Sequence, residues 1–147
     1  MKGISILPFA ALALASCGGP RQLAVDHGWV RLPAVTGHPA AAYFELHGGP
    51  TDETLVSVES PVALHAQMHK TVNRNGVDMM LPLKQVDVPA GKTVKFAPGV
   101  RHVMLYGLNM QQVKPGGTVG LHFIFADGTE IDYAAKAIPA SAPDPEN

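Results

Sequence analysis

Two histidines and two methionines near the middle of the chain form the pattern with the clearest chemical meaning. They are His69, Met80, His102 and Met104, spaced as H-x10-M-x21-H-x-M. Two neutral imidazoles and two thioethers, with no thiolate, make a soft ligand set that suits Cu(I) and disfavours Mg²⁺, Ca²⁺ and structural zinc. The residue types and their spacing therefore predict a copper-binding site.

One predicted strand would carry half of this site. The alternating segment Arg101–Tyr106 follows the chain breaker Ala97-Pro98-Gly99, which is typical of a strand that begins after a turn. Side chains at positions i and i+2 of a strand leave from the same face. We therefore expect His102 and Met104 to project together.

A predicted hairpin would bring up the other half. Residues 64–72 and 77–83 flank a loop that contains Asn-Gly, a strong signal for a tight hairpin turn. A two-residue loop places His69 diagonally across from Met80, and a four-residue loop places the two directly opposite each other. Either register brings their side chains within reach.

The same strand parity separates two adjacent methionines. In both registers Met80 shares a face with His69, whereas Met79 lies on the opposite face. Met80 is therefore the better ligand, and only a three-residue loop would reverse this choice. Taken singly, each member of the pattern would more often be an ordinary packing or polar residue. Their joint placement on converging strands favours the metal site.

Other residues of the same types are weaker candidates. Met68 points to the face opposite His69, which favours a packing role. His65 shares the face of His69 and is either an accessory ligand or, more often for such a residue, an exposed polar side chain. The remaining histidines have no partner at ligand spacing and receive no metal role: His27, His38, His47 and His122.

The sequence around the four residues resembles the periplasmic copper chaperones of the PCuAC family. Their motif is matched at every position over residues 66–108, and similarity extends more weakly over residues 28–138. The flanking segments Pro89–Val94, Phe96–Gly99 and His102–Leu108 are also similar to that family.

This resemblance implies a cupredoxin-like Greek-key β-sandwich or barrel that carries Cu(I) and is not an enzyme. The four residues of the motif would be the copper ligands. The implied recipient is subunit II of cytochrome c oxidase, which holds the copper A centre, or another copper-accepting protein. The chain departs from the usual pattern of that family at three positions, none of which is a ligand. Tyr106 stands where many relatives have a methionine, Lys70 where an acidic residue is common, and Leu81 where a basic residue is common.

The first residues predict export and a lipid anchor. Lys2 precedes an apolar run over residues 4–14, and small residues then lead to Cys17, as in bacterial lipoprotein signals. Cleavage would remove residues 1–16 and leave a lipid-modified Cys17. Because Gly18 rather than Asp follows, the resemblance implies a periplasmic protein tethered to the outer membrane. The alternative is a plain secretory signal in which the cysteine is coincidental. The apolar run over residues 4–14 is too short to span a bilayer.

Length, charge and cysteine content narrow the remaining possibilities. The chain has 147 residues, 11 basic and 12 acidic side chains and a single cysteine. We expect a linker over residues 17–27, one copper-binding domain over 28–138 and a disordered tail over 139–147, in a monomer. A lone cysteine excludes a disulfide framework and a blue-copper thiolate within that domain. The charge balance gives no indication of nucleic-acid binding.

Ten short segments with strand-like composition predict an all-β fold. Glycine, proline and asparagine separate them, and no long helical pattern is present. The segments are residues 29–32, 41–46, 54–58, 64–72, 77–83, 85–88, 93–96, 102–108, 118–125 and 131–137.

Two other classes of protein stay open from the sequence. A metal-free β-sandwich lipoprotein that acts in assembly or interaction would bind no Cu(I) and would instead present a docking patch. A copper oxidase or a superoxide dismutase analogue would need more closely spaced histidines than the chain offers. Metal analysis after anaerobic purification separates both classes from a carrier.

Overall fold

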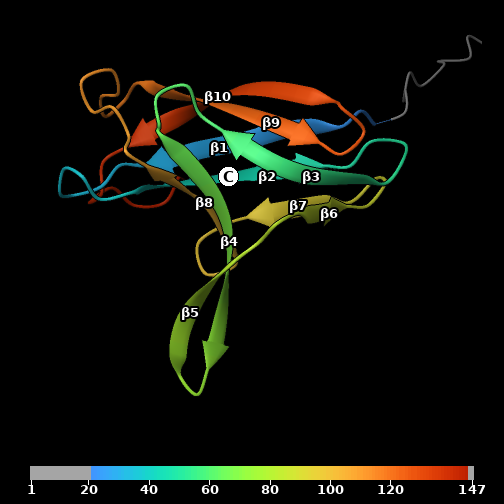
Figure 1. The fold of residues 1–147 in the computed structure, drawn as a ribbon, viewed down its shortest axis with the longest axis horizontal. Helices are drawn as coiled ribbons and strands as arrows, with labels where there is room; N and C mark the ends of the chain where they lie inside the picture. Colours follow the sequence, from blue (N-terminus) through green and yellow to red (C-terminus); the bar gives the residue numbers. More distant parts are fainter. Residues whose placement is uncertain (1–20, 146–147) are drawn as a thin grey trace, which may run out of the picture.

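The structure is a computed structural model that describes residues 21–145, and all regular elements in this part of the chain are strands (Figure 1). The strands are β1 (Ala24–Arg31), β2 (Ala40–His47), β3 (Glu53–Glu59), β4 (His65–Arg74), β5 (Val77–Pro82), β6 (Val86–Val88), β7 (Thr93–Phe96), β8 (Arg101–Tyr106), β9 (Thr118–Phe125) and β10 (Glu130–Ile138). Each overlaps one of the ten predicted segments, so the all-β prediction is confirmed. Within the described residues no helix is long and apolar enough to cross a bilayer.

The strands form one continuous mixed sheet. Their order is β5-β4-β8-β2-β1-β10-β9-β3-β6, and β7 pairs with β2 beside β8. Strands β1 and β10 run parallel, and the other pairings described are antiparallel. Strand β8 therefore lies between the hairpin strand β4 and the central strand β2, which fixes the surroundings of the predicted ligands.

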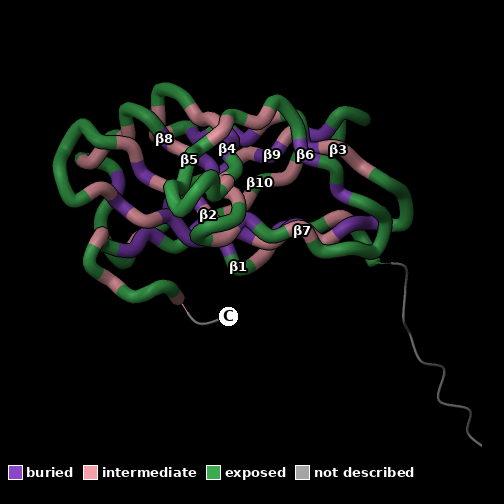
Figure 2. Tube along the Cα trace, turned by 90° about the horizontal axis from the view of Figure 1, so that it is seen from below, coloured by how far each residue is buried: buried purple, intermediate pink, exposed green. Residues whose placement is uncertain are grey.

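The sheet closes around a single apolar core. Strands β2 and β9 alternate between buried and less buried residues, as expected for strands with one face in a core. Phe44 lies at its centre, stacked on Phe96 at a centroid distance of 4.3 Å and edge-on to Phe123 at 4.8 Å. Buried stretches of different strands face one another across the interior (Figure 2). The opposite face of β2 remains free to carry polar side chains.

The hairpin of β4 and β5 projects from the body of the domain as an arm (Figure 1). Arg74 pairs with Val77, so the loop consists of Asn75 and Gly76. Both loop residues have positive φ, 53° and 81°, as a type I′ turn requires. The two-residue register is therefore the one the protein adopts, and the three-residue loop that would exchange the two methionines is wrong.

Substitution of Gly76 by alanine is expected to loosen the tip of the arm. A Cβ atom there would meet nothing within 4 Å, so only the left-handed backbone is penalised, by about 1 kcal/mol. Amide hydrogen exchange in β5 should accelerate roughly fivefold, the equivalent of that free energy. Asn75→Gly is the control, because it removes a Cβ from a position with positive φ and should not accelerate exchange. Equal exchange rates in both variants would contradict a type I′ turn.

Parts of the predicted organisation lie at the ends of the chain. The predicted signal peptide and Cys17 fall outside the described residues. Residues 139–145 of the predicted disordered tail are described, and Arg31 contacts them: it donates hydrogen bonds to the carbonyls of Ala140 and Ala142, at 3.1 and 2.6 Å, and pairs with Asp144. These contacts give residues 139–145 a place on the surface, whereas the boundaries of the domain remain predictions.

Candidate metal centre

Two histidines face each other across neighbouring strands. His69 of β4 lies directly opposite His102 of β8 in the antiparallel register. Their rings are stacked, with centroids 5.6 Å apart and planes inclined by 19°. The adjacent pair Met68 and Val103 is buried in the core. Strand alternation therefore directs both imidazoles to the outer face of the sheet.

Both imidazoles are buried although they lie on this outer face. His69 is 8% exposed and His102 is 4% exposed. The Nδ1 atom of His69 and the Nε2 atom of His102 have no hydrogen-bond partner in the part of the chain that the structure describes. A buried polar atom without a partner costs about 1–3 kcal/mol. The two rings therefore place two such nitrogen atoms, which can accept a hydrogen bond or bind a metal ion, in one small region.

The two methionines of the motif border a shared hollow with one of these histidines. Met104 follows His102 at the i+2 position and is half-buried, whereas Met80 lies on the arm and is 61% exposed. Met80, His102 and Met104 all line a hollow of about 340 Å³. His69 is not part of its lining, and lies behind it in the ring stack with His102.

The register places each methionine as the sequence predicts. Met80 lies opposite Thr71 and hence diagonally across from His69, whereas Met79 lies opposite Val72 on the other face. The remaining wall of the hollow comes from β2, the arm and the turn before β8: Ala41, Tyr43, Thr71, Asp78, Pro98 and Gly99. The structure thus brings three of the four predicted ligands to one hollow and the fourth into ring contact with them.

Tyr43 adds an aromatic wall rather than an anionic ligand. Its ring lies 6.3 Å from that of His102 and 4.4 Å from that of Trp29. Burial raises the pKa of Tyr43, and the nearby charge of Arg31 offsets only part of this rise. The phenol is therefore protonated at neutral pH. The polar side chain of Asp78 at the rim is held by Asn73, whose amide donates a 2.7 Å hydrogen bond to its carboxylate. Neutral groups therefore dominate the hollow.

The surroundings of His102 favour its uncharged ring. Burial lowers the pKa of His102, and the neighbouring His69 lowers it further because two imidazolium ions would repel each other. A metal-binding imidazole must be neutral. His102 is therefore ready to bind a metal at a pH at which a free imidazole is already partly protonated.

This lowered pKa predicts an acid-sensitive fold in the metal-free protein. Below about pH 6.5 the unfolded chain takes up a proton at His102 that the folded chain does not. The free energy of unfolding should therefore fall as the pH drops from 6.5 toward the lowered pKa. Urea denaturation at a series of pH values should show this loss, and His102→Leu should make it shallower. His122 cannot be its source, because the carboxylate of Asp132 raises the pKa of that exposed histidine and gives the opposite sign.

The weaker candidates have ordinary surroundings. Met68 is 4% exposed and packs in the core, as its parity predicts. His65 is exposed and stacks on Tyr106, opposite it in the strand pair, at a centroid distance of 5.8 Å. His38 is exposed, and His122 contacts the carboxylate of Asp132.

Two histidines without a predicted metal role nevertheless lie close together. His27 of β1 and His47 of β2 meet beside two carboxylates, those of Asp26 and Glu45. The sequence indicates part of this cluster, because Glu45 and His47 stand at positions i and i+2 of one strand and therefore share a face. Which strand pairs with β2, and the irregularity that turns His27 toward it, are not visible in the sequence.

Comparisons with known proteins agree on family and fold. A family model described as "Putative lipoprotein LpqE-like" matches residues 23–137. A curated relative named "Putative lipoprotein Lxx21020", from Leifsonia xyli subsp. xyli, is 33% identical over 111 residues. That match covers 75% of this chain and 66% of the relative, just under two thirds of its length.

Solved structures show the same architecture. The copper-bound PCuAC domain from PmoF2 is 19% identical with a TM-score of 0.66, and the match covers 82% of this chain and 96% of that domain. The solution structure of CuI-DR1885 from Deinococcus radiodurans is 27% identical with a TM-score of 0.56, and the match covers 76% of this chain and 74% of that one. The predicted cupredoxin-like β-fold and the resemblance to PCuAC domains are therefore confirmed. The chain belongs to the LpqE-like family, and its fold is that of the PCuAC domains.

Proposed function

We propose that this protein is a copper carrier that binds Cu(I) and passes it to another protein. Its ligands are His69, Met80, His102 and Met104. The observation that carries the proposal is the pair of buried histidine nitrogens that have no hydrogen-bond partner among residues 21–145, next to a hollow bordered by both thioethers. A soft monovalent ion satisfies both features, since imidazole and thioether together select Cu(I).

The similar structures support copper rather than another metal. One is a copper-bound PCuAC domain, and another, at 27% identity, is DR1885 with Cu(I). Both share the strand arrangement that carries the four residues here. The motif spacing in this chain adds the donor atoms themselves, which the likeness in fold alone does not supply.

The placement of the four ligands suits release as well as binding. The histidine pair is buried, whereas Met80 sits on the projecting arm and is largely exposed. All four donors are neutral, so a partner that offers thiolates binds Cu(I) more strongly. Stepwise exchange would begin at the exposed thioether, and no covalent bond of a substrate changes, so the proposed role is not enzymatic.

Apolar side chains on the arm provide a docking surface for such a partner. Large exposed apolar residues on β4, β5, β8 and their loops are Leu64, Val77, Met79, Met80, Val100 and Tyr106. Val77, Met79 and Met80 lie on β5 of the arm, whereas Leu64 and Tyr106 lie at the opposite end of β4. The three residues of the arm are the proposed docking surface, because neighbouring exposed apolar groups are typical of interaction sites. The proposed recipient is a copper-accepting protein, such as the copper A subunit of cytochrome c oxidase.

The proposed location is outside the cytoplasm, on a membrane. The curated relative is named a lipoprotein, as is the matching family. Together with the signal-like start of the chain, these names support lipidation of Cys17, and the Gly18 that follows it is the basis for proposing the outer membrane. Mass spectrometry of the membrane-extracted protein tests this, because a diacylated Cys17 at the new N-terminus is the expected product.

Anaerobic Cu(I) titration against a chromogenic chelator tests the proposed function. We expect one Cu(I) per chain at this site, and its transfer to a soluble copper A domain when the two proteins are mixed. A metal-free interaction module, the alternative function, predicts no competition with the chelator. Absence of Cu(I) binding in a folded chain would refute the carrier and favour that alternative.

A further inference from the structure

A second group of ligand-type side chains lies on the outer face of β1 and β2. We call it the outer cluster: Asp26, His27, Glu45 and His47. Asp26 and Glu45 are paired directly across the two strands, and His47 follows Glu45 at i+2 on the same face. None of these residues belongs to the proposed Cu(I) site, and the inference does not depend on that site.

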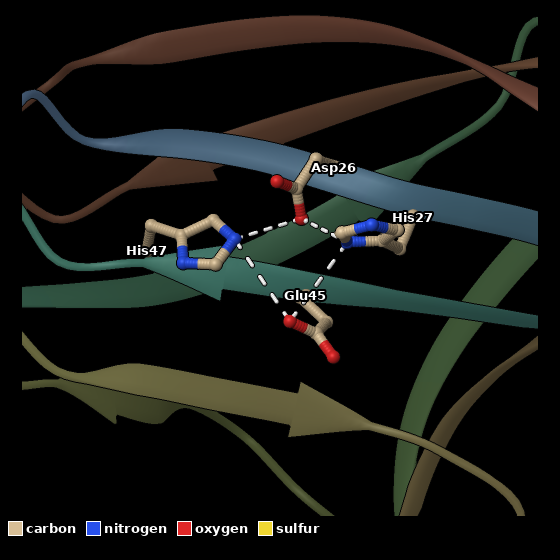
Figure 3. Close-up of side chains that lie close together, drawn as sticks. All are labelled: Asp26, His27, Glu45 and His47. Atoms are coloured by element: carbon tan, nitrogen blue, oxygen red, sulfur yellow. Dashed lines mark hydrogen bonds and ion pairs between the residues drawn. The ribbon is translucent and has the colours of Figure 1, made fainter. Parts of the chain in front are cut away.

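A local irregularity completes the cluster. The register between β1 and β2 shifts between Asp26 and Trp29, and His27 has a φ of 48°. In a regular strand His27 would point to the face opposite Asp26. The bulge with its left-handed residue turns the imidazole back toward Asp26 and Glu45, as Figure 3 shows. A non-glycine residue in this conformation is uncommon and often marks a functional constraint.

The four donor atoms surround one point at distances that suit a metal ion. His47 Nε2 and His27 Nδ1 lie 2.7 and 2.9 Å from Asp26 Oδ1. Both nitrogens also lie 3.9 Å from the same oxygen of Glu45, Oε2. Ligand atoms around tetrahedral zinc, bound at 2.0–2.1 Å, are about 3.3 Å from one another. All four donor atoms lie within 4.8 Å of one another, so side-chain shifts of up to about 1.5 Å would bring them to tetrahedral spacing.

Neighbouring residues hold the donors in place. The other ring nitrogen of His47, Nδ1, contacts Thr93 Oγ1 at 3.0 Å, which fixes the ring with Nε2 toward the centre. Such an outer hydrogen bond is the usual partner of a metal-binding histidine. Glu45 Oε1 pairs with Lys95 Nζ at 2.6 Å, which leaves Oε2 turned to the cluster. The side chains of Asp26 and His27 are each 47% exposed, so an ion has access from solvent.

We propose that the outer cluster is a second metal site that takes a divalent transition ion, Zn²⁺ or Cu²⁺. Two imidazoles and two carboxylates form a nitrogen and oxygen set of borderline hardness, which binds such dications and is unsuited to Cu(I). The two carboxylates supply two negative charges toward a dication, one of which is already offset by the ion pair between Glu45 and Lys95. The soft site and this site would therefore select different metals, or different oxidation states of copper.

The two sites lie on the same face of β2 but are separate. Ala41 and Tyr43 of β2 border the hollow of the soft site, and Glu45 lies four and two residues further along the strand, about 13 and 7 Å away at 3.3 Å per residue. Tyr43, whose ring packs against that of Trp29 with the planes inclined by 31°, lies between Ala41 and Glu45 along β2. A variant of either site should therefore leave the other intact.

Calorimetric titration of the purified full chain with Zn²⁺ alone, and separately with Cu²⁺ alone, tests this site. We expect one equivalent of Zn²⁺, Cu²⁺ or both to bind, and His47→Gln and Asp26→Asn to weaken it at least tenfold. His122→Gln is the matched control, because that imidazole also contacts a carboxylate, Asp132 Oδ1 at 2.7 Å. Met104→Leu should also leave this binding unchanged.

Spectroscopy and folding controls separate the outcomes. Zinc K-edge absorption should show two imidazoles and two oxygens at about 2.0–2.2 Å, and the Cu²⁺ form should show nitrogen hyperfine coupling in paramagnetic resonance. Circular dichroism checks that each variant is folded. The proposal is overturned if neither ion binds the parent chain, or if folded His47→Gln and Asp26→Asn bind it as the parent does.

Discussion

Replacement of His102 by leucine is expected to weaken Cu(I) binding about a hundredfold while leaving the metal-free fold as stable as before or more stable. If four ligands share a binding free energy on the order of 10–16 kcal/mol, as at structural zinc sites, each supplies about 3 kcal/mol. That is about a hundredfold in Kd. The same substitution removes a buried nitrogen that has no hydrogen-bond partner within the described part of the chain. Its removal eliminates a destabilising contribution of about 1–3 kcal/mol.

The opposite signs of these two effects distinguish a binding site from a structural histidine pair. A histidine that stabilised the fold would lower the midpoint of urea denaturation when replaced, with no change in Cu(I) affinity. His69→Leu should behave as His102→Leu does, since the two rings are stacked and both are buried. His65→Leu is the control, because that exposed histidine stacks on Tyr106 outside the hollow. Unchanged chelator competition in both leucine variants of the pair would refute the site.

The sequence predicts the strands of this protein well because their signals are local. Alternating side chains, asparagine and glycine at turns, and proline at strand ends place all ten strands. The parity argument also selects Met80 over Met79, since it needs only the length of one loop, and Asn75-Gly76 determines that length. That His102 and Met104 point to the same face of the sheet also follows from their separation by two residues.

The pairing of distant strands is not encoded in such local patterns. That β4 lies beside β8, in a register that sets His69 opposite His102, follows from the strand order of the whole sheet. The resemblance to a known family implied only that the four residues of the motif share one copper ion. The outer cluster was not predicted, because no family resemblance indicated that its residues lie together. His27 and His47 are twenty residues apart, and an irregularity in β1 turns one of them toward the other. Sequence spacing gives no indication of that irregularity.

Replacement of Met80 by leucine should weaken Cu(I) binding about tenfold or more, whereas Met79→Leu should not change it. The two methionines are adjacent on the arm, and both are exposed, 61% and 41%. Leucine and methionine have similar volumes, so neither substitution should disturb packing. The strand parity is thus the main difference between them: Met80 borders the hollow with His102 and Met104, and Met79 faces away. Because Met80 is exposed, its replacement should cost less binding free energy than replacement of a buried histidine, about 1.4 kcal/mol.

This matched pair also tests how copper leaves the site. If the exposed thioether is the first ligand to be exchanged, Met80→Leu should speed the transfer of Cu(I) to an acceptor by about the factor by which it weakens binding. Met104→Leu should weaken binding without a matching gain in rate, because that half-buried sulfur lies deeper in the hollow. Stopped-flow transfer to a thiolate chelator measures both rates. Equal acceleration in the two variants would show that release does not begin at Met80. Equal effects of Met79→Leu and Met80→Leu would remove Met80 from the set of ligands.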